Sequence, residues 1–274
     1  MSNYSIDLIF FDNSELLESC EIDNQNQLLY FVSIYKKLVY CFDINTGTIN
    51  SMPTNGLVGC VRALSYKKLI VAETHGIYEF DFNTLSSIKL NDFVKEDGVR
   101  FNDGRLDSNG RFLIGTMGYP EITANKGKLY SYFEGNYTTL LNDITISNGI
   151  AFTNDDKTMF YIDTPTKKVL KYSYDLKNGT ISNKSDFIVF DTVSVPDGMF
   201  IDSNQHLFIA EWGGSCISKW DSNNGKLLER YQLPVLNITS CAIDIHNNIY
   251  ITTAKSENTD EYFGGALLYL KFIK

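Results

Sequence analysis

The sequence predicts an all-β chain made of six similar units, and three observations support this prediction. Apolar and polar residues alternate with a period near two, for example over residues 39–43 and 77–82. Aromatic residues, which favour strands, make up 14% of the chain. A unit of apolar strand, polar turn and second strand recurs six times, with equivalent positions at Leu28, Lys68, Arg111, Thr158, His206 and Asn248. Repeats of this length with several short strands each are typical of a β-propeller. We therefore predict a six-bladed β-propeller with four-stranded antiparallel blades around a central channel.

The units follow one another along the chain without a linker or a low-complexity segment, so we expect a single domain over residues 1–274. The two clearest strands of each unit are expected at 27–34 and 37–43, 68–73 and 76–82, 110–117 and 128–132, 157–163 and 168–174, 205–212 and 216–221, and 249–253 and 266–272. The apolar run at residues 6–11 has no partner in the first unit. We expect it to join the last blade and close the ring, which removes exposed sheet edges.

The composition excludes several classes of function. A net charge of -9 argues against a nucleic-acid groove, which needs a surplus of Lys and Arg on one face. Five widely spaced cysteines without a C-x-x-C pair are typical of buried free thiols in a reducing cytoplasm. The N-terminal residues do not resemble a signal peptide, and no apolar run approaches the roughly 20 residues that cross a bilayer. We expect a cytoplasmic protein, a monomer or weak dimer, with neither nucleic acid nor membrane as partner.

Oxygen-bearing side chains recur at one position of the repeat. The segments 17–24, 147–154 and 195–204 share a pattern in which a polar residue precedes an apolar run that ends in a turn. Glu18, Asn148 and Asp197 each stand five residues before the residue that opens this turn. The innermost strands of a propeller line its channel, so equivalent positions should form a ring at one end. The same count in all units gives the ring Glu18, Cys60, Asp103, Asn148, Asp197 and Thr239.

Carboxylate and amide oxygens that converge in this way suit a hard divalent cation. Asn-Gly and Asp-Gly are also common turn dipeptides, but here each precedes an apolar strand and does not link the two strands of a hairpin. The three histidines stand apart from one another and from the ring, so no zinc cluster is expected. We predict a site for a divalent cation or another polar ligand at Glu18, Asn148 and Asp197; for a cation, Ca²⁺ is favoured and Zn²⁺, Mn²⁺, Mg²⁺ or Fe²⁺ are left open.

Several phrases resemble, as a set and in order, the senescence-marker-protein/gluconolactonase/luciferin-regenerating-enzyme family. They are residues 100–107 (RFNDGRLD), 115–117 (GTM), 146–149 (ISNG), 161–163 (YID) and 196–199 (PDGM). The resemblance implies a six-bladed propeller whose channel holds a divalent cation through a glutamate, an asparagine and an aspartate. These match Glu18, Asn148 and Asp197, the residues that the repeat position selects.

The resemblance also implies lactone hydrolysis, with Asp197 as the proton acceptor and Arg100 and Asn102 in contact with substrate oxygens. From the sequence alone, Arg100 is equally consistent with a surface charge. The function we expect is a metal-dependent lactonase that converts an aldonolactone to its aldonic acid. A metal-dependent esterase and a non-catalytic calcium-binding propeller are the alternatives, and Arg100 and Asn102 beside a cation favour an enzyme.

Two segments depart from the family pattern. Leu17 precedes Glu18 where the family usually has glycine, so Glu18 is assigned by its position in the repeat. Gly118, Tyr119 and Pro120 replace the acidic residues that some members carry after Gly-Thr-Met, and Glu121 comes next. We expect Glu121 to contact the substrate, and the sugar specificity to differ from that of animal gluconolactonases.

Overall fold

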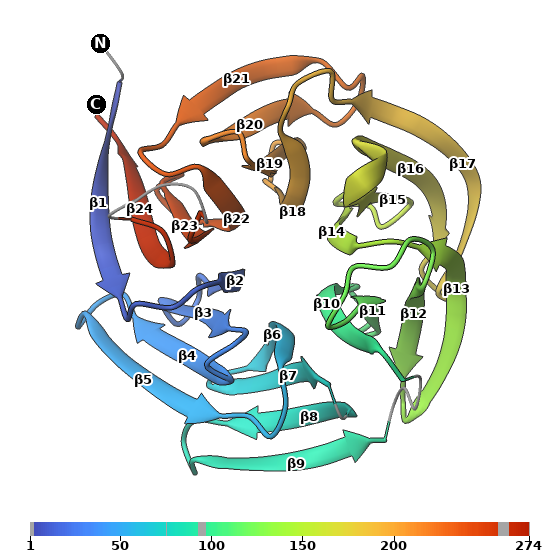
Figure 1. Ribbon diagram of the computed structural model, residues 1–274, viewed down its shortest axis with the longest axis horizontal. Coiled ribbons are helices and arrows are strands. Elements are labelled where there is room, and N and C mark those ends of the chain that lie inside the picture. The colour runs from blue at the N-terminus through green and yellow to red at the C-terminus, as the bar shows by residue number, and fades with distance from the viewer. Residues whose placement is uncertain (1–2, 75, 93–96, 257–262, 274) are drawn as a thin grey trace.

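Twenty-four strands form six four-stranded antiparallel sheets in the computed structural model, which describes residues 3–74, 76–92, 97–256 and 263–273. The sheets are arranged like blades around one axis, with the first strand of each blade nearest the centre (Figure 1). The predicted six-bladed β-propeller is therefore confirmed. The one helical segment in the described chain is a short 3₁₀ helix, η1 (Thr164–Thr166).

Each of the first five blades is a run of four consecutive strands. Blades 1 and 2 consist of β2 (Leu17–Asp23), β3 (Leu28–Ser33), β4 (Leu38–Asp43), β5 (Thr48–Pro53), β6 (Val58–Ser65), β7 (Lys68–Glu73), β8 (Gly76–Asp81) and β9 (Ser86–Asn91). Blades 3 and 4 consist of β10 (Val99–Leu106), β11 (Phe112–Gly118), β12 (Gly127–Phe133), β13 (Asn136–Ile144), β14 (Ser147–Phe152), β15 (Thr158–Asp163), β16 (Lys168–Asp175) and β17 (Thr180–Val189). Blade 5 consists of β18 (Val195–Ile201), β19 (His206–Trp212), β20 (Cys216–Asp221) and β21 (Leu227–Gln232).

The sixth blade joins the two ends of the described chain. It consists of β22 (Asn237–Ile243), β23 (Ile249–Ala254), β24 (Ala266–Phe272) and β1 (Tyr4–Phe11). Strand β1 pairs antiparallel with β24, so that the N-terminal segment forms the outer strand of the last blade (Figure 1). This pairing confirms the predicted closure of the ring and covers the outer edge of β24.

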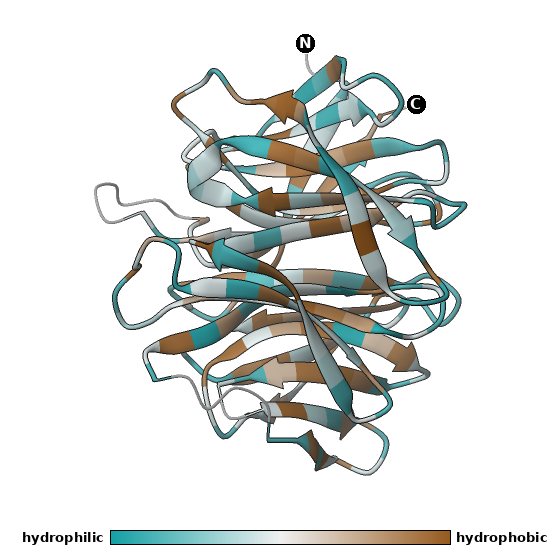
Figure 2. Cartoon of the chain, turned by 90° about the vertical axis from the view of Figure 1, so that its right-hand side faces the viewer, coloured by the Kyte–Doolittle hydropathy of each residue, from teal (hydrophilic) through white to brown (hydrophobic). Residues whose placement is uncertain are grey.

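Apolar side chains fill the spaces within and between the blades. The six buried clusters are rich in Leu, Ile, Val, Phe and Tyr, and several combine residues from two neighbouring blades. Apolar and polar bands alternate along the strands, as the alternation in the sequence predicted (Figure 2). All five cysteines are buried and free, which confirms the prediction of buried thiols. Within the described residues, no helix has the length and hydropathy needed to cross a bilayer.

The inner strands β2, β6, β10, β14, β18 and β22 all contain a β-bulge. A bulge inserts one extra residue opposite the neighbouring strand and re-aims the side chains beside it. In β6 the bulge lies between Val58 and Cys60, so Gly59 is the residue at this point. A Cβ atom on Gly59 would lie 2.5 Å from the carbonyl oxygen of Phe101 in β10. The inner strands of blades 2 and 3 therefore approach so closely that only glycine fits.

This contact predicts that Gly59→Ala is costly. The new methyl group meets backbone atoms of β10, which cannot rotate aside, so we expect the free energy of unfolding to fall by about 3 kcal/mol. Gly47→Ala is the matched control, because Gly47 has a φ of +71° but no atom within 4 Å of the added Cβ. Its expected cost is about 1 kcal/mol, from backbone strain alone. Denaturant unfolding of both variants measures the difference, and equal stabilities would contradict the close approach.

Candidate active site

The bulges bring polar side chains of different blades to one level of the channel. In β14 and β18 the extra residues lie just after Ser147 and Pro196, which places Asn148 and Asp197 at equivalent positions. In β10 the same register places Asn102 at this level. Glu18 stands one residue earlier in β2, immediately before its bulge. The residues predicted from the repeat thus lie at the same end of the inner strands.

The ring predicted by counting needs correction in blades 2 and 3. In blade 3 the residue equivalent to Asn148 and Asp197 is Asn102 and not Asp103, whose carboxylate pairs with Arg62 at 2.8 Å. Cys60 does not line the channel but is fully buried in an apolar cluster with Ile70 and Phe101, where burial raises the pKa of its thiol. The residue at the bulge is Gly59, so blade 2 contributes no side chain at this level. Thr239 stands at the bulge of β22, but its hydroxyl donates to the carbonyl oxygen of Leu17 at 2.6 Å. The count was wrong for blade 2 because β6 has a second register shift, between Ala63 and Ser65, which adds a residue between its bulge and the following turn.

Arg100, Asn102 and Asn148 form a chain of hydrogen bonds across blades 3 and 4. The Nη1 atom of Arg100 donates to Oδ1 of Asn102 at 2.7 Å and to the carbonyl oxygen of Phe101 at 2.9 Å. The Nδ2 atom of Asn102 donates to Oδ1 of Asn148 and to the carbonyl oxygen of Ser147, both at 2.9 Å. Arg100 is therefore not a surface charge: it is 6% exposed and faces the site.

Thr164 fixes the other side of Asn148, and the sequence analysis did not identify it. The Nδ2 atom of Asn148 donates to Oγ1 of Thr164 at 2.7 Å, and Thr164 donates in turn to the carbonyl oxygen of Pro196 at 2.9 Å. Thr164 thereby links the amide of Asn148 to the residue that precedes Asp197. Its place in η1, after a strand and outside the repeated phrase, gave no signal in the sequence.

Glu18 and Asp197 carry the strongest electrostatic perturbation in the channel. Burial raises the pKa of the Glu18 carboxyl to about 8, and the nearby charge of Asp103 adds to this effect. Burial also raises the pKa of Asp197 well above its usual range, followed by the charges of Glu18 and Asp103, while Arg100 opposes them. Within the described part of the chain, no Lys, Arg or His nitrogen lies within 4.0 Å of either carboxylate.

The residues fit a hard cation. Asp197 is buried and Glu18 is half-buried, and neither has an ion-pair partner, so both need a nearby positive charge if they are to ionise; a divalent cation would supply it. Asn148 adds a neutral oxygen, because Oδ1 accepts one hydrogen bond from Asn102 and retains a second lone pair. Among the described residues, no group of three or more His, Cys, Asp or Glu side chains is placed to hold a metal. The set is therefore two carboxylates and one amide, which favours an oxygen-seeking ion over zinc.

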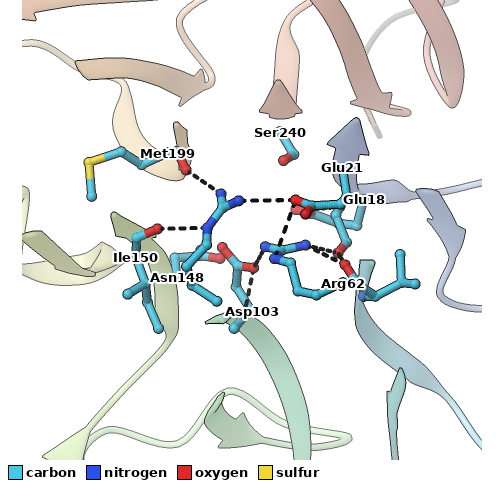
Figure 3. A network of polar contacts seen from close by, with 12 residues as sticks. Glu18, Glu21, Arg62, Asp103, Asn148, Ile150, Met199 and Ser240 are labelled. Atoms are coloured by element: carbon cyan, nitrogen blue, oxygen red, sulfur yellow. Dashed lines mark hydrogen bonds and ion pairs between the residues drawn. The ribbon is translucent and has the colours of Figure 1, made fainter. Parts of the chain in front are cut away.

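A layer of ion pairs occupies the channel next to these residues (Figure 3). Arg62 donates through Nη2 to Oδ1 of Asp103 at 2.8 Å, and Arg105 donates through Nη1 to Oε2 of Glu21 at 3.0 Å. Arg105 also donates to the carbonyl oxygens of Ile150 and Met199. These charges are matched pairwise, in contrast to those of Glu18 and Asp197. The sequence analysis assigned no role to Arg62, Arg105 or Glu21.

Glu121 lies on a loop, whereas the other predicted site residues lie on inner strands. It is exposed in the loop between β11 and β12, where its carbonyl oxygen accepts a hydrogen bond from Thr123 at 3.3 Å. Tyr119, at the start of the same loop, is half-buried and lies close enough for its phenol to raise the pKa of Arg100, which burial lowers. A contact between Glu121 and substrate stays a prediction.

A cavity of about 410 Å³ lies at the other end of the inner strands. Its lining includes Leu106, Phe152 and Ile201, which are the last residues of β10, β14 and β18. Arg105 forms part of its wall, while none of the predicted site residues does. The two ends of the channel therefore differ in chemistry, and the perturbed carboxylates lie at the end without this cavity.

Comparison with known proteins identifies the family. Residues 16–255 match the SMP-30/Gluconolactonase/LRE-like region. The chain belongs to this family. It is 31% identical over 245 residues to the Bacillus subtilis protein named "Putative sugar lactone lactonase YvrE", a match that covers 87% of this chain and 83% of that protein. It is 30% identical over 265 residues to human regucalcin, covering 93% and 88% of the two chains.

A solved protein structure has the same fold as this chain. The structure of a calcium-binding protein, regucalcin from Agrobacterium tumefaciens, matches with a TM-score of 0.90 at 22% identity and covers 97% of this chain and 93% of that chain. The resemblance noted from the sequence is thus confirmed, and membership of the family supports a lactonase-like hydrolase.

The raised carboxyl pKa values predict a pH dependence of stability in the metal-free protein. A carboxyl group whose pKa is higher in the folded than in the unfolded state stabilises the fold below its unfolded pKa and loses this contribution as pH rises through the folded pKa. For Glu18 the window runs from about 4.5 to about 8. We therefore expect the melting temperature of chelator-treated protein to fall across this range.

A divalent cation should reverse this trend, because it binds the ionised carboxylates and stabilises the folded state by mass action. Thermal unfolding at pH 5 to 8.5, with EDTA or with 1 mM Ca²⁺, measures both effects. Glu18→Gln removes one titrating group and should flatten the dependence. A metal-free protein that becomes more stable between pH 5 and 8 would contradict the assignment.

Proposed function

We propose that this protein is a divalent-metal-dependent lactonase that hydrolyses a sugar lactone to the corresponding aldonic acid. The observation that carries the proposal is a pair of carboxylates without an ion-pair partner beside Asn148: Asp197 is buried and Glu18 is half-buried, and burial raises the pKa of both. Arg100 and Asn102 adjoin them and provide donors for substrate oxygens. Membership of the family and the similarity to the Bacillus subtilis protein support the lactone as substrate class.

Glu18, Asn148 and Asp197 would hold the cation. We propose Ca²⁺ as the ion, because all three side chains offer oxygen and two are anionic. The Agrobacterium relative, described as a calcium-binding protein, is consistent with this choice. When bound, the cation supplies a Lewis acid that polarises the lactone carbonyl.

Asp197 acts in this proposal as the general base. Its carboxylate takes a proton from the water that attacks the carbonyl carbon. The bond between that carbon and the ring oxygen then breaks, and Asp197 returns the proton to the ring oxygen to give the hydroxy acid. Because burial favours the protonated form, Asp197 can accept a proton only when nearby positive charge keeps it ionised. Arg100, which already lowers the pKa of Asp197, contributes to this charge.

Arg100 and Asn102 orient the substrate. The Nε atom of Arg100 is buried and has no hydrogen-bond partner among the described residues, so a donor remains for a lactone oxygen. Its Nη1 atom is held by Asn102 and by the backbone of Phe101, which fixes the plane of the guanidinium. A donor fixed in place before substrate binds loses little entropy when it makes its contact.

Replacement of the ligands tests the proposal. Asp197→Ala removes a ligand and the base together, so lactone hydrolysis should fall by at least about 100-fold. Asn148→Ala removes a neutral ligand and should mainly weaken cation affinity, with partial recovery of activity at high metal concentration. Calorimetric titration with Ca²⁺, Mn²⁺ and Zn²⁺, with assays of aldonolactones in the presence and absence of chelator, provides the readouts.

The outcomes separate the candidate functions. Cation binding without turnover of any lactone or simple ester would favour a non-catalytic calcium-binding propeller. Turnover of esters but not of lactones would favour an esterase. If Asp197→Ala retains both parental cation affinity and lactonase activity, the proposed site is wrong.

Arg100 should affect substrate binding more than cation binding. Arg100→Ala removes a substrate donor, so KM for an aldonolactone should rise about tenfold or more, while cation affinity stays within about threefold. Glu121→Gln should raise KM less, since Glu121 lies on an exposed loop. Lys219→Ala is the control, because Lys219 lies in β20, whose neighbours are β19 and β21, away from the inner strand that carries Asp197. A KM unchanged in Arg100→Ala would exclude Arg100 from the substrate site.

A further inference from the structure

Arg62 is the most deeply buried charged side chain in the channel. It extends from β6 with 2% of its surface exposed, and its guanidinium reaches two neighbouring blades (Figure 3). Nη1 donates to Oγ of Ser19 at 2.6 Å, and Nη2 donates to Oδ1 of Asp103 at 2.8 Å. Burial acts to lower the pKa of Arg62, but the charges of Asp103, Glu21 and Glu18 outweigh it and raise the pKa, so the guanidinium remains charged.

The Nη1 atom of Arg62 contacts Ser19, the residue that orients Glu18. Ser19 is the bulge residue after Glu18, and its φ of +59° lies in the left-handed region that serine adopts only at a cost. The hydroxyl of Ser19 holds this conformation, since it accepts from Nη1 of Arg62 and from the backbone nitrogen of Val61 at 2.9 Å. In this conformation the backbone nitrogen of Ser19 donates to Oε2 of Glu18 at 2.7 Å.

The Nη2 atom of Arg62 contacts Asp103, the residue that follows Asn102. The Oδ1 atom of Asp103 accepts from Arg62 and also from the backbone nitrogen of Gly104 at 2.7 Å. Asp103 thus fixes the bulge of β10 just after Asn102, whose side chain binds Asn148. Two nitrogen atoms of one guanidinium therefore bind Ser19 and Asp103, the residues that directly follow Glu18 and Asn102.

We propose that Arg62 is a positioning residue of the cation site, which sets the orientation of Glu18 through Ser19 and of Asn102 through Asp103. The inference rests on the proposed function for the identity of the ligand. It explains how blade 2 takes part in the site although Gly59 leaves it without a side chain at the level of Asn148. Blade 2 acts from the next level of the channel, through an arginine long enough to reach blades 1 and 3.

A role in stability alone does not account for this arrangement. Replacing a buried ion pair by apolar side chains of similar volume is often neutral or stabilising, so an apolar pair would serve a purely structural channel equally well. The planar fork of arginine instead fixes two partners in one geometry. Outer partners of metal ligands typically change metal affinity or activity by about 10- to 100-fold when they are removed.

The test uses variants that keep the charge of the channel, because loss of a positive charge would by itself strengthen cation binding. Arg62→Lys retains the charge but cannot hold Ser19 and Asp103 in one plane, so we expect Ca²⁺ affinity to fall about tenfold. Ser19→Gly tolerates the positive φ and removes the hydroxymethyl group that Arg62 contacts, and a similar loss of Ca²⁺ affinity is expected. The double variant should bind no more weakly than Arg62→Lys alone, because both changes break the same link.

Arg111→Lys is the matched control. Arg111 is 6% exposed and donates to Asp107 at 2.8 Å, but this pair lies away from the predicted ligands, beside Tyr174. Its Ca²⁺ affinity should stay within about threefold of the parent, whatever its melting temperature. Calorimetric titration and thermal unfolding of all variants separate affinity from stability, and Ser19→Gly carries the test if Arg62→Lys does not fold.

Parental affinity in both folded Arg62→Lys and Ser19→Gly would overturn the positioning role and leave the proposed function intact. The same loss of affinity in Arg111→Lys would show a general effect of buried arginines and would also overturn it. A parent protein that binds no divalent cation would overturn the proposed function and this inference with it.

Discussion

The unpaired carboxylates of Glu18, which is half-buried, and Asp197, which is buried, are the constraint on which the arrangement of the channel depends. Taking an ion from water into a protein costs several kcal/mol unless a partner compensates it. Arg62 and Arg105 each have a carboxylate partner, while Glu18 and Asp197 have none in the described structure. Such an imbalance, at one end of the channel only, is typical of a site that completes itself with a ligand.

The backbone makes this arrangement possible. A regular strand would turn successive side chains alternately toward the two neighbouring blades and away from the channel. The bulges interrupt this alternation at one level, so that Asn148 and Asp197 face the axis while the apolar residues on either side still pack between blades. The same feature brings Asn102 into line with them. The inner strands therefore contribute residues both to the candidate site and to the apolar core.

In this geometry the apolar clusters, the inner strands and the loop after β11 have different roles. The apolar clusters between blades hold the inner strands in place, and closure of the ring by β1 leaves little freedom for them to separate. Ligand oxygens placed on such strands are more rigid than oxygens placed on loops, which lowers the entropy lost on binding. The exposed loop after β11, with Glu121, is the part of the candidate site that can vary without disturbing the fold.

The repeat of alternating strands was sufficient to predict the six blades, the closing strand at residues 6–11 and the level of Glu18, Asn148 and Asp197. These features are periodic, because each blade buries its apolar faces in the same way and so repeats the same pattern. Cys60 was misplaced because a count along the chain assumes the same register in every inner strand, and β6 has a second shift between Ala63 and Ser65.

The contacts of Arg62 with Ser19, of Thr164 with Pro196 and of Arg105 with Glu21 could not be read from the sequence, since each joins residues from different blades. Which partner a long side chain reaches depends on the local bulge and on how closely the strands approach around the axis. Those distances exist only after the ring has closed, so the polar contacts that orient the site were decided by tertiary structure alone.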